Sequence, residues 1–329
     1  MTLPSENKKG PGTDKPRRRR VLVLLLILLV LSYVGGLVYV HFLQEKLAYH
    51  PTRGAGATPQ AAGLDYEDVW LVTADGVRVH SWYVPKTRPR GYVIFSHGNA
   101  GNLSDRLAQI SILNELGFAS LFLDYRGFGR SGGRPTEQGT YLDVAAAWGW
   151  LVNKHGVRPE QVVLWGRSLG GAVAAHQAVK TTPGALVLES TFTDILAVGQ
   201  RRFPFFPLRL VANRLDYDTE DILPEVRCPV LVVHSPDDGV VPYEHGQRLF
   251  EIAAEPKRFL KISGSHNRGF LDSVGEYKAG LDAFFRSIGW QAAIPRKKPG
   301  IGGPSAGLPG SDSGTVTPRQ VQPMREEQR

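Results

Sequence analysis

The sequence predicts an α/β protein whose helices cover both faces of a mostly parallel β-sheet. Between residues 65 and 290, short runs of β-branched and other apolar residues alternate with longer stretches of helical character. Strand runs that are almost continuously apolar are typical of parallel sheets buried on both faces. Hydrophobic residues make up 42% of the 329-residue chain, which is enough to form the core of one large domain.

Eight strands are expected in this region. Residues 65–72 and 77–84 flank Thr73-Ala74-Asp75-Gly76, and a turn of this composition between two strand-like runs predicts an antiparallel hairpin. The hairpin adds an antiparallel edge to the sheet. The other predicted strands are residues 92–96, 119–124, 162–165, 185–189, 230–234 and 258–262.

Helices are expected between these strands, because parallel neighbours need a crossover connection that is usually an α-helix. The stretches with helical character are residues 104–115, 137–154, 169–180, 243–253 and 275–288.

Residues 21–40 form a charge-free apolar segment of 20 residues. A helix of this length measures about 30 Å, which matches the hydrocarbon core of a bilayer. Four arginines, residues 17–20, precede the segment directly, whereas only Glu45 and Lys46 follow it closely. By the positive-inside bias, residues 1–20 stay in the cytoplasm, residues 21–41 form a single-pass transmembrane anchor, and the later chain lies on the non-cytoplasmic side. In a bacterium that side is periplasmic or extracellular.

Two other interpretations of residues 21–40 remain open. A cleaved signal peptide has a shorter apolar region of about 7–15 residues and a small-residue cleavage site, and the sequence shows neither feature. A buried core helix is the second alternative, although an apolar stretch of this length is more typical of a membrane span. A retained anchor is therefore favoured.

The net charge of +8 is confined to the two ends of the chain. Residues 1–20 carry +5 and residues 291–329 carry +3, which leaves residues 21–290 at zero. The sequence therefore predicts no nucleic-acid partner. Residues 291–329 are rich in Pro, Gly and Ser and are expected to be a disordered tail. The single cysteine, Cys228, excludes an intrachain disulfide and a thiolate metal cluster.

The segment Gly166-Arg167-Ser168-Leu169-Gly170 lies between a predicted strand and a predicted helix. Strand, Gly-x-Ser-x-Gly and helix in this order are typical of a nucleophile elbow, in which a tight turn presents the serine hydroxyl. Glycines stand two residues before and after the serine because side chains there would collide. Ser168 is thus the candidate nucleophile, and the alternative is a turn that merely uses small residues.

A serine nucleophile needs a histidine as base and a carboxylate to orient that histidine. Asp237 and Asp238 follow the predicted strand 230–234, and His266 follows the last predicted strand in a loop of small residues. The order Ser, Asp, His is that of α/β hydrolases. The residues alone leave the choice between the two aspartates open, and His266 could instead be an ordinary loop histidine.

An oxyanion hole requires two backbone N–H donors. The N–H of Leu169, directly after the nucleophile, is one candidate. The loop 97–102, which follows the third predicted strand, supplies the second through the backbone of Asn99.

No cofactor or metal is expected. The segment 127–132 fits the dinucleotide pattern Gly-x-Gly-x-x-Gly, but it does not directly join a strand to a helix as that pattern requires. A rigid loop is the better interpretation. No pair of histidines shows metal-ligand spacing.

A long insertion separates the strands predicted at 185–189 and 230–234. It covers about residues 190–228 and contains Phe192, Leu208 and the run Phe203-Pro204-Phe205-Phe206-Pro207. Its position above the nucleophile predicts a small cap. The aromatic residues either line an apolar substrate pocket or only pack the cap onto the domain.

Five motifs together resemble the α/β-hydrolase superfamily: HGNAG at 97–101, DYRGFGRSGG at 124–133, GRSLGG at 166–171, D-x-x-VP at 238–242 and GSHN at 264–267. The resemblance covers about residues 42–290. It is greatest to a membrane-anchored branch of serine hydrolases that includes serine-aminopeptidase-type, monoacylglycerol-lipase-like and depalmitoylase-like enzymes. The chain departs from this branch at His234-Ser235, where relatives often have His-Gly.

The resemblance implies an α/β-hydrolase fold with a small cap and the triad Ser168, Asp238 and His266, because the D-x-x-VP spacing selects Asp238. We expect a membrane-anchored serine hydrolase that cleaves an ester or thioester of an acyl or lipid-like small molecule through an acyl-serine intermediate. One alternative is a serine peptidase or aminopeptidase with the same triad. Another is a catalytically silent, anchored binding module.

Overall fold

The computed structural model describes residues 15–291. The expected cytoplasmic segment 1–20 is described only from residue 15 onward. The expected disordered tail, apart from Gln291, lies outside the described residues.

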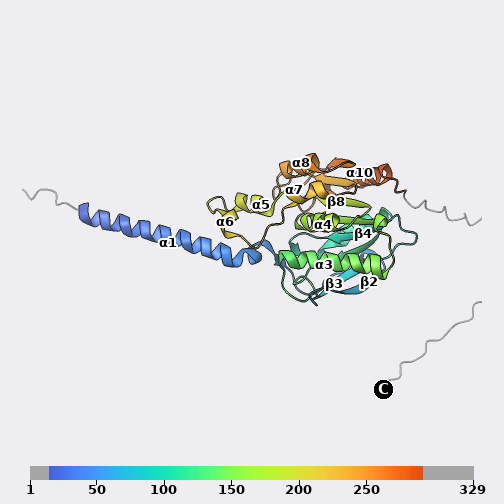
Figure 1. The fold of residues 1–329 in the computed structure, drawn as a ribbon, viewed down its shortest axis with the longest axis horizontal. Coiled ribbons are helices and arrows are strands. Elements are labelled where there is room, and N and C mark those ends of the chain that lie inside the picture. The colour runs from blue at the N-terminus through green and yellow to red at the C-terminus, as the bar shows by residue number, and fades with distance from the viewer. Residues whose placement is uncertain (1–14, 292–329) are drawn as a thin grey trace, which may run out of the picture. The chain divides into compact units, whose positions relative to one another are not determined.

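Eight strands form one sheet in the order β10-β9-β8-β7-β4-β6-β3-β2 (Figure 1). Strand β3 is antiparallel to both β2 and β6, and all other neighbours are parallel. The predicted parallel sheet with an antiparallel edge is therefore confirmed. The strands are β2 (Glu67–Val72), β3 (Arg78–Val84), β4 (Tyr92–Ser96), β6 (Ala119–Leu123), β7 (Val162–Arg167), β8 (Ala185–Glu189), β9 (Val230–His234) and β10 (Lys257–Lys261).

Helices cover both faces of this sheet, as predicted. Successive residues of β4 point to opposite faces, because side chains alternate along a strand. Ile94 joins one apolar cluster and Phe95 joins the other. The first cluster is covered by α3 (Glu137–Gly149), α4 (Leu169–Lys180) and α8 (Tyr243–Ile252), and the second by α2 (Leu107–Glu115) and α10 (Val274–Ser287).

Two helices are shorter than predicted: one ends earlier and the other starts later. The stretch 137–154 is α3 followed by a π-helical turn, and the stretch 104–115 begins with a 3₁₀ turn before α2. The Asn102 side chain caps that 3₁₀ turn by accepting from the Ser104 N–H, so the regular helix starts later. The short helical elements are η1 (Pro59–Ala62), η2 (Leu103–Arg106), η3 (Trp150–Lys154), η4 (Pro159–Gln161), η5 (Leu223–Glu225) and α9 (Gly269–Asp272).

Helix α1 (Lys15–Ala48) runs without a break through the apolar segment and beyond the expected domain boundary at residues 41 and 42. It is the one helix of the described residues that is long and apolar enough to cross a membrane. Its apolar side chains between Val21 and Leu31 are about half exposed or more. This helix is therefore not buried in a protein core.

A two-residue pairing fixes the chain just after α1. Strand β1 (His50–Pro51) pairs in parallel with β5 (Ala100–Gly101). The His50 N–H donates to the Asn99 carbonyl over 2.8 Å. Neither strand was predicted, because two residues are too few for a periodic pattern.

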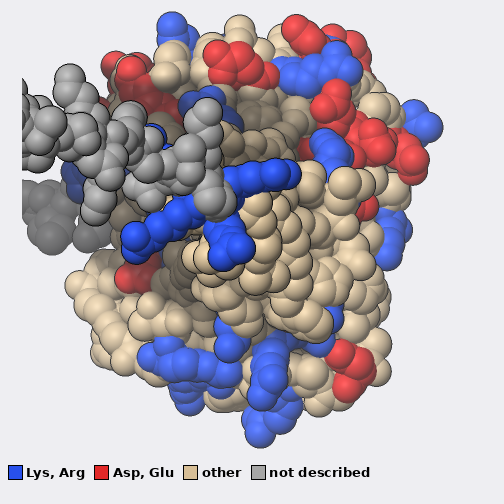
Figure 2. Space-filling view, turned by 90° about the vertical axis from the view of Figure 1, so that its left-hand side faces the viewer, with Lys and Arg blue, Asp and Glu red and all other residues tan. Residues whose placement is uncertain are grey.

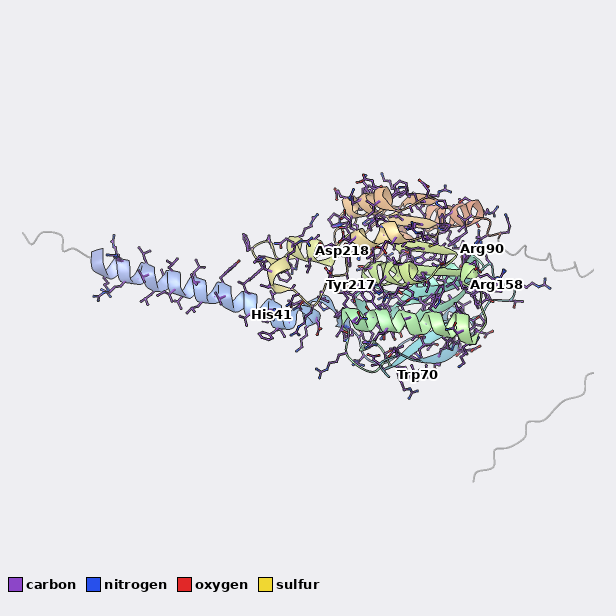
Figure 3. The ribbon with its side chains drawn as sticks, viewed as in Figure 1. His41, Trp70, Arg90, Arg158, Tyr217 and Asp218 are labelled. Atoms are coloured by element: carbon purple, nitrogen blue, oxygen red, sulfur yellow. The ribbon has the colours of Figure 1, made fainter. Side chains whose placement is uncertain are left out.

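The insertion between β8 and β9 contains the helices α5 (Ile195–Arg202), α6 (Leu208–Val211) and α7 (Thr219–Ile222). Helix α6 contacts the carboxyl-terminal half of α1, and α5 packs on α6 (Figure 1). On α1, the His41 Nδ1 lies 2.9 Å from the Val211 carbonyl oxygen (Figure 3). We call this insertion the cap; its helix α6 contacts α1.

Candidate active site

Ser168 stands at a sharp turn between β7 and α4, with φ +53° and ψ −123°. Such a positive φ is rare for a residue other than glycine. A Cβ added to Gly166 would lie 1.9 Å from the Gly170 carbonyl oxygen, and one added to Gly170 would lie 1.9 Å from that of Ser96. Both contacts are sterically impossible, so the two glycines permit the turn. The local geometry is that of a nucleophile elbow.

The structure brings Ser168, His266 and Asp238 together. The His266 Nε2 lies 3.1 Å from the Ser168 Oγ. On the other side of the ring, the His266 Nδ1 lies 2.7 Å from the Asp238 Oδ2. These distances are within the hydrogen-bond range that a serine, histidine and aspartate relay requires.

The environment of Asp238 favours the ionised carboxylate. Burial by itself would raise the pKa of Asp238, but the hydrogen bond to His266 and the backbone N–H groups of Val241 and Val240 outweigh it and lower this pKa. Each of these N–H groups donates to the Asp238 Oδ1 over 2.9 Å. Asp237 is exposed and accepts instead from the Gly264 N–H over 3.0 Å. Of the two aspartates, Asp238 is the one that contacts His266.

Arg167, next to the candidate nucleophile, holds the backbone of His266. Its guanidinium donates to the His266 carbonyl oxygen over 2.5 Å, and its Nε lies 3.5 Å from Glu189. Glu189 is buried and also accepts from the Tyr277 hydroxyl over 2.6 Å. Sequence reasoning did not single out Arg167, because the elbow pattern places no requirement on this position.

The candidate oxyanion donors are the N–H of Leu169, which follows Ser168 in the chain, and the N–H of Asn99 in the loop after β4. A Cβ added to Gly98 would lie 3.5 Å from the Ser168 Cβ, so the loop after β4 packs directly against the nucleophile. Within residues 15–291, no protein group accepts a hydrogen bond from the backbone N–H of Leu169 or Asn99.

The end of α1 supports this oxyanion loop. The Asn99 side chain donates from Nδ2 to the Ala48 carbonyl oxygen over 2.6 Å. Directly after α1, Tyr49 is buried, and its hydroxyl lies 2.7 Å from that of Tyr217. Tyr217 follows α6 in the chain and is labelled in Figure 3. These contacts join residues far apart in the sequence, and no sequence pattern indicated them.

A cavity of about 430 Å³ opens above Ser168 and His266. Its walls come from the elbow, the oxyanion loop, the cap and the last turns of α1. Most of the wall is apolar. Apolar side chains on α1 and the cap include Val40, Leu47, Leu196, Phe203 and Leu208.

The charged side chains that line this cavity are all arginines: Arg106, Arg167 and Arg202. No Asp or Glu of residues 15–291 lines it. Because Glu189 lies 3.5 Å from Arg167, the positive charge at the cavity comes mainly from Arg106 and Arg202.

Other histidines have structural contacts. His97 Nδ1 lies 2.6 Å from the Gly98 carbonyl oxygen, and His234 Nε2 lies 3.0 Å from that of Val241. Within the part of the chain that the structure describes, no three His, Cys, Asp or Glu side chains are placed to hold a metal ion.

Comparison with known proteins identifies relatives along most of the chain. A family model described as serine aminopeptidase, S33, matches residues 87–219. The uncharacterized protein Rv2307c of Mycobacterium tuberculosis is 38% identical over 256 residues, which cover 74% of this chain and 90% of the relative. The alpha/beta hydrolase domain-containing protein WAV2 of Arabidopsis thaliana is 35% identical over 67% of this chain and 79% of the relative.

Two further similarities concern an esterase and a lipase. The lysophosphatidylserine lipase ABHD12 of Macaca fascicularis is 32% identical over 58% of this chain and 52% of the relative. The fold is similar to that of the esterase Pf2001 of Pyrococcus furiosus, with a TM-score of 0.62 and 22% identity over 73% of this chain and 100% of that structure. The chain belongs to the α/β-hydrolase superfamily and is an enzyme of the serine-hydrolase type that includes esterases and lipases.

Proposed function

We propose that the protein is a membrane-anchored serine hydrolase that cleaves a carboxylic ester or thioester of an acyl or lipid-like small molecule. The observation that carries this proposal is the relay from Ser168 through His266 to Asp238 at the base of an apolar cavity.

In the proposed reaction, the Ser168 Oγ attacks the substrate carbonyl carbon while the His266 Nε2 takes the hydroxyl proton. Asp238 keeps the other ring proton on Nδ1 and stabilises the imidazolium. The bond to the alcohol or thiol then breaks, and His266 donates its proton to that leaving group. Water, activated by the same histidine, attacks the acyl-serine and releases the carboxylic acid.

Negative charge develops on the carbonyl oxygen in both steps. The N–H groups of Leu169 and Asn99 are proposed to stabilise that charge. Loss of one such donor typically costs about 10²- to 10³-fold in rate. No metal or organic cofactor enters this reaction.

The charge of the cavity favours an ester over an aminopeptidase substrate. An aminopeptidase must accommodate a positively charged α-amino group, which carboxylates usually bind. Here the charged lining consists of arginines, with no acidic side chain from residues 15–291, so an ammonium group would be repelled. The apolar walls instead match an acyl chain. The similarity to a lysophosphatidylserine lipase supports the same choice.

The proposed anchor is α1, with residues 1–20 in the cytoplasm, residues 21–41 in the membrane and the hydrolase domain, residues 42–290, on the other side. Support comes from the length and uncovered apolar surface of α1. Retention of the helix is also supported by the contacts of Ala48 with the oxyanion loop and of Val40 with the cavity. Removal of a signal peptide within or after this segment would delete a wall of the proposed site. Residues 190–228 are the proposed cap, and residues 291–329 a separate tail.

A fluorophosphonate probe tests the nucleophile, because it reacts covalently with an activated serine. We expect the full-length protein to be labelled and Ser168→Ala to lose both the label and about 10⁶-fold in kcat. Ser111→Ala is the matched control, since the Ser111 hydroxyl only donates to the Leu107 carbonyl oxygen on α2. No labelling of the unaltered protein would instead support a silent binding module, whereas equal labelling of Ser168→Ala would show that the nucleophile is another residue.

A substrate panel tests the reaction class. Acyl esters, acyl thioesters and aminoacyl amides of matched leaving-group reactivity are compared by kcat/KM. Faster turnover of the aminoacyl amides than of the esters would replace this proposal with the aminopeptidase alternative.

A further inference from the structure

The cap carries two unusually exposed apolar side chains next to its contact with α1. Phe205 and Leu210 are 84% and 81% exposed, the highest values among the large apolar side chains of residues 15–291. Single exposed apolar residues are common on soluble proteins. These two, however, flank a turn that packs against a helix whose own apolar surface is uncovered.

The cap contacts α1 inside the apolar segment 21–40. The Tyr33 hydroxyl donates to the Phe205 carbonyl oxygen over 3.1 Å, and the Tyr33 ring stacks on that of Phe206 at a centroid distance of 5.7 Å. A Cβ added to Gly36 would lie 2.7 Å from the Phe206 ring, so the absent side chain admits the ring. Tyr33 precedes Val40 by seven residues, which is about 10 Å along a helix axis.

The charge of the same segment fits a membrane surface. Residues 195–214 contain four arginines and no Asp or Glu. Arg201, Arg202 and Arg214 are exposed, whereas Arg209 pairs with Asp194. Exposed apolar side chains bordered by arginines are typical of segments that lie in the headgroup region and attract anionic lipids. On the face that Figure 2 presents, Lys and Arg side chains gather mostly along the lower edge, which is the side of β2 and β3 in Figure 1 and not that of the cap.

The cavity extends to the region where α1 and the cap lie together. Val40 and Gln44 on α1 line it together with Phe203 and Leu208 on the cap. Val40 is the last residue of the apolar segment 21–40. The cavity wall therefore begins where the proposed membrane span ends.

We propose that residues 203–210 of the cap insert into the bilayer leaflet that α1 leaves near Val40. The cavity then receives an acyl chain directly from that leaflet, between α1 and the cap, so its methylene groups do not cross water. This inference rests on the anchor in the proposed function and adds a second membrane contact to it. In this proposal, the exposed surface of the cap contacts lipid.

The single cysteine of the chain makes insertion measurable. Cys228 is buried, and burial raises the pKa of its thiol to about 12, so it reacts poorly with thiol probes. Phe205→Cys is labelled with an environment-sensitive fluorophore, and the full-length protein is placed in vesicles of phosphatidylcholine and phosphatidylglycerol. Lipids with a nitroxide quencher on the acyl chain report contact. Leu28→Cys on α1 is the control for a position inside the membrane. Val72 on β2 is 65% exposed, and Val72→Cys is the control for a position in water.

We expect the label at 205 to be quenched as the label at 28 is, while the label at 72 is not. Quenching at 28 without quenching at 205 would overturn cap insertion and leave the anchor intact. No quenching at 28 would overturn the anchor, and this inference with it. Neither result depends on the activity of Ser168.

A second experiment tests lipid entry. The double variant Phe205→Asp/Leu210→Asp places two charges in the proposed membrane contact, although neither residue lines the cavity. We expect kcat/KM for a long-chain monoacyl ester in vesicles to fall at least about tenfold, while turnover of a soluble butyrate ester and fluorophosphonate labelling stay unchanged. Val72→Asp should change none of these. An unchanged rate on the vesicle substrate, or equal losses on both esters, would overturn entry from the leaflet.

Discussion

The elbow and the cap face each other across one cavity, but they are held in place differently. The backbone of Ser168 is hydrogen-bonded at both its polar groups: its N–H donates to the Glu189 carbonyl oxygen over 2.9 Å, and its carbonyl accepts from the Thr191 hydroxyl over 2.5 Å. The turn of the cap at Phe206 instead packs on α1 and is bordered by exposed side chains. The difference predicts that changes in the cap alter the choice of substrate while the geometry around Ser168 stays constant.

The largest effect that tests this separation is expected at Asp238. Asp238→Asn should lower kcat by about 10⁴-fold, because an amide no longer stabilises the correct His266 tautomer. The loss should be the same for short and long acyl esters. Asp237→Asn is the control and should retain activity, since the Asp237 carboxylate accepts from the Gly264 N–H over 3.0 Å and does not contact His266. A loss that varied with acyl length would show that the two regions are coupled.

The next effect concerns the stability of the elbow. Gly170→Ala should lower the free energy of unfolding by about 3 kcal/mol, because its Cβ would meet the Ser96 carbonyl oxygen at 1.9 Å. Gly275→Ala in α10 meets nothing within 4 Å and should be neutral or slightly stabilising. Thermal and denaturant unfolding of the detergent-solubilised protein measure both. Similar stabilities of the two variants would contradict the steric account of the turn.

Two neighbouring glycines on α1 test whether the contact between α1 and the cap affects substrate selection. Gly36→Leu should displace Phe206, whereas Gly35→Leu enters open space. We expect Gly36→Leu to change the ratio of kcat/KM between long and short acyl esters by about tenfold and to leave kcat for the short ester unchanged. Gly35→Leu should leave the ratio as it is. If both variants behaved alike, the contact between α1 and the cap would not select the substrate.

The smallest effect concerns pH and His176 on α4. Burial is the main cause that lowers the pKa of His176 from 6.5 to about 4, and its ring stacks on Tyr141 at 3.6 Å. Between pH 6.5 and about pH 4 the unfolded chain binds a proton at His176 that the folded chain does not bind. The free energy of unfolding therefore falls as the pH decreases through this window. After allowance for solvent screening, this loss in the free energy of unfolding is about 1 kcal/mol.

His176→Phe keeps an aromatic stack and removes the titration. Unfolding midpoints measured from pH 7 to pH 4 should therefore fall less steeply in the variant. The kcat of the variant at neutral pH should not change, because His176 does not line the cavity. An identical pH slope in both proteins would contradict the prediction.

The parts of this molecule that local sequence determines were predictable. Strands such as β8 and β9 have the predicted bounds, because each is one continuous apolar run. The position of Ser168 followed from a turn that tolerates only glycine at Gly166 and Gly170. Local pattern and three-dimensional packing coincide at these places.

The remaining features depend on residues that meet only in the folded chain. The approach of Phe206 to Tyr33 and the bond from Asn99 to Ala48 join segments with no common pattern. Asp237 and Asp238 are adjacent, so only the direction of each side chain distinguishes them. The extension of α1 to Ala48 also escaped prediction, because its last turn is stabilised by the domain that follows rather than by its own apolar character.

The bond from the Asn99 side chain to the Ala48 carbonyl has a practical consequence. Biochemists often express such enzymes in soluble form by trimming away the leading hydrophobic stretch. A chain shortened to begin after Ala48 would lose both this brace and the neighbouring wall contributed by Val40 and Leu47. Measurements on that shortened form would describe a different catalyst, so the native enzyme should be studied with its leading helix attached.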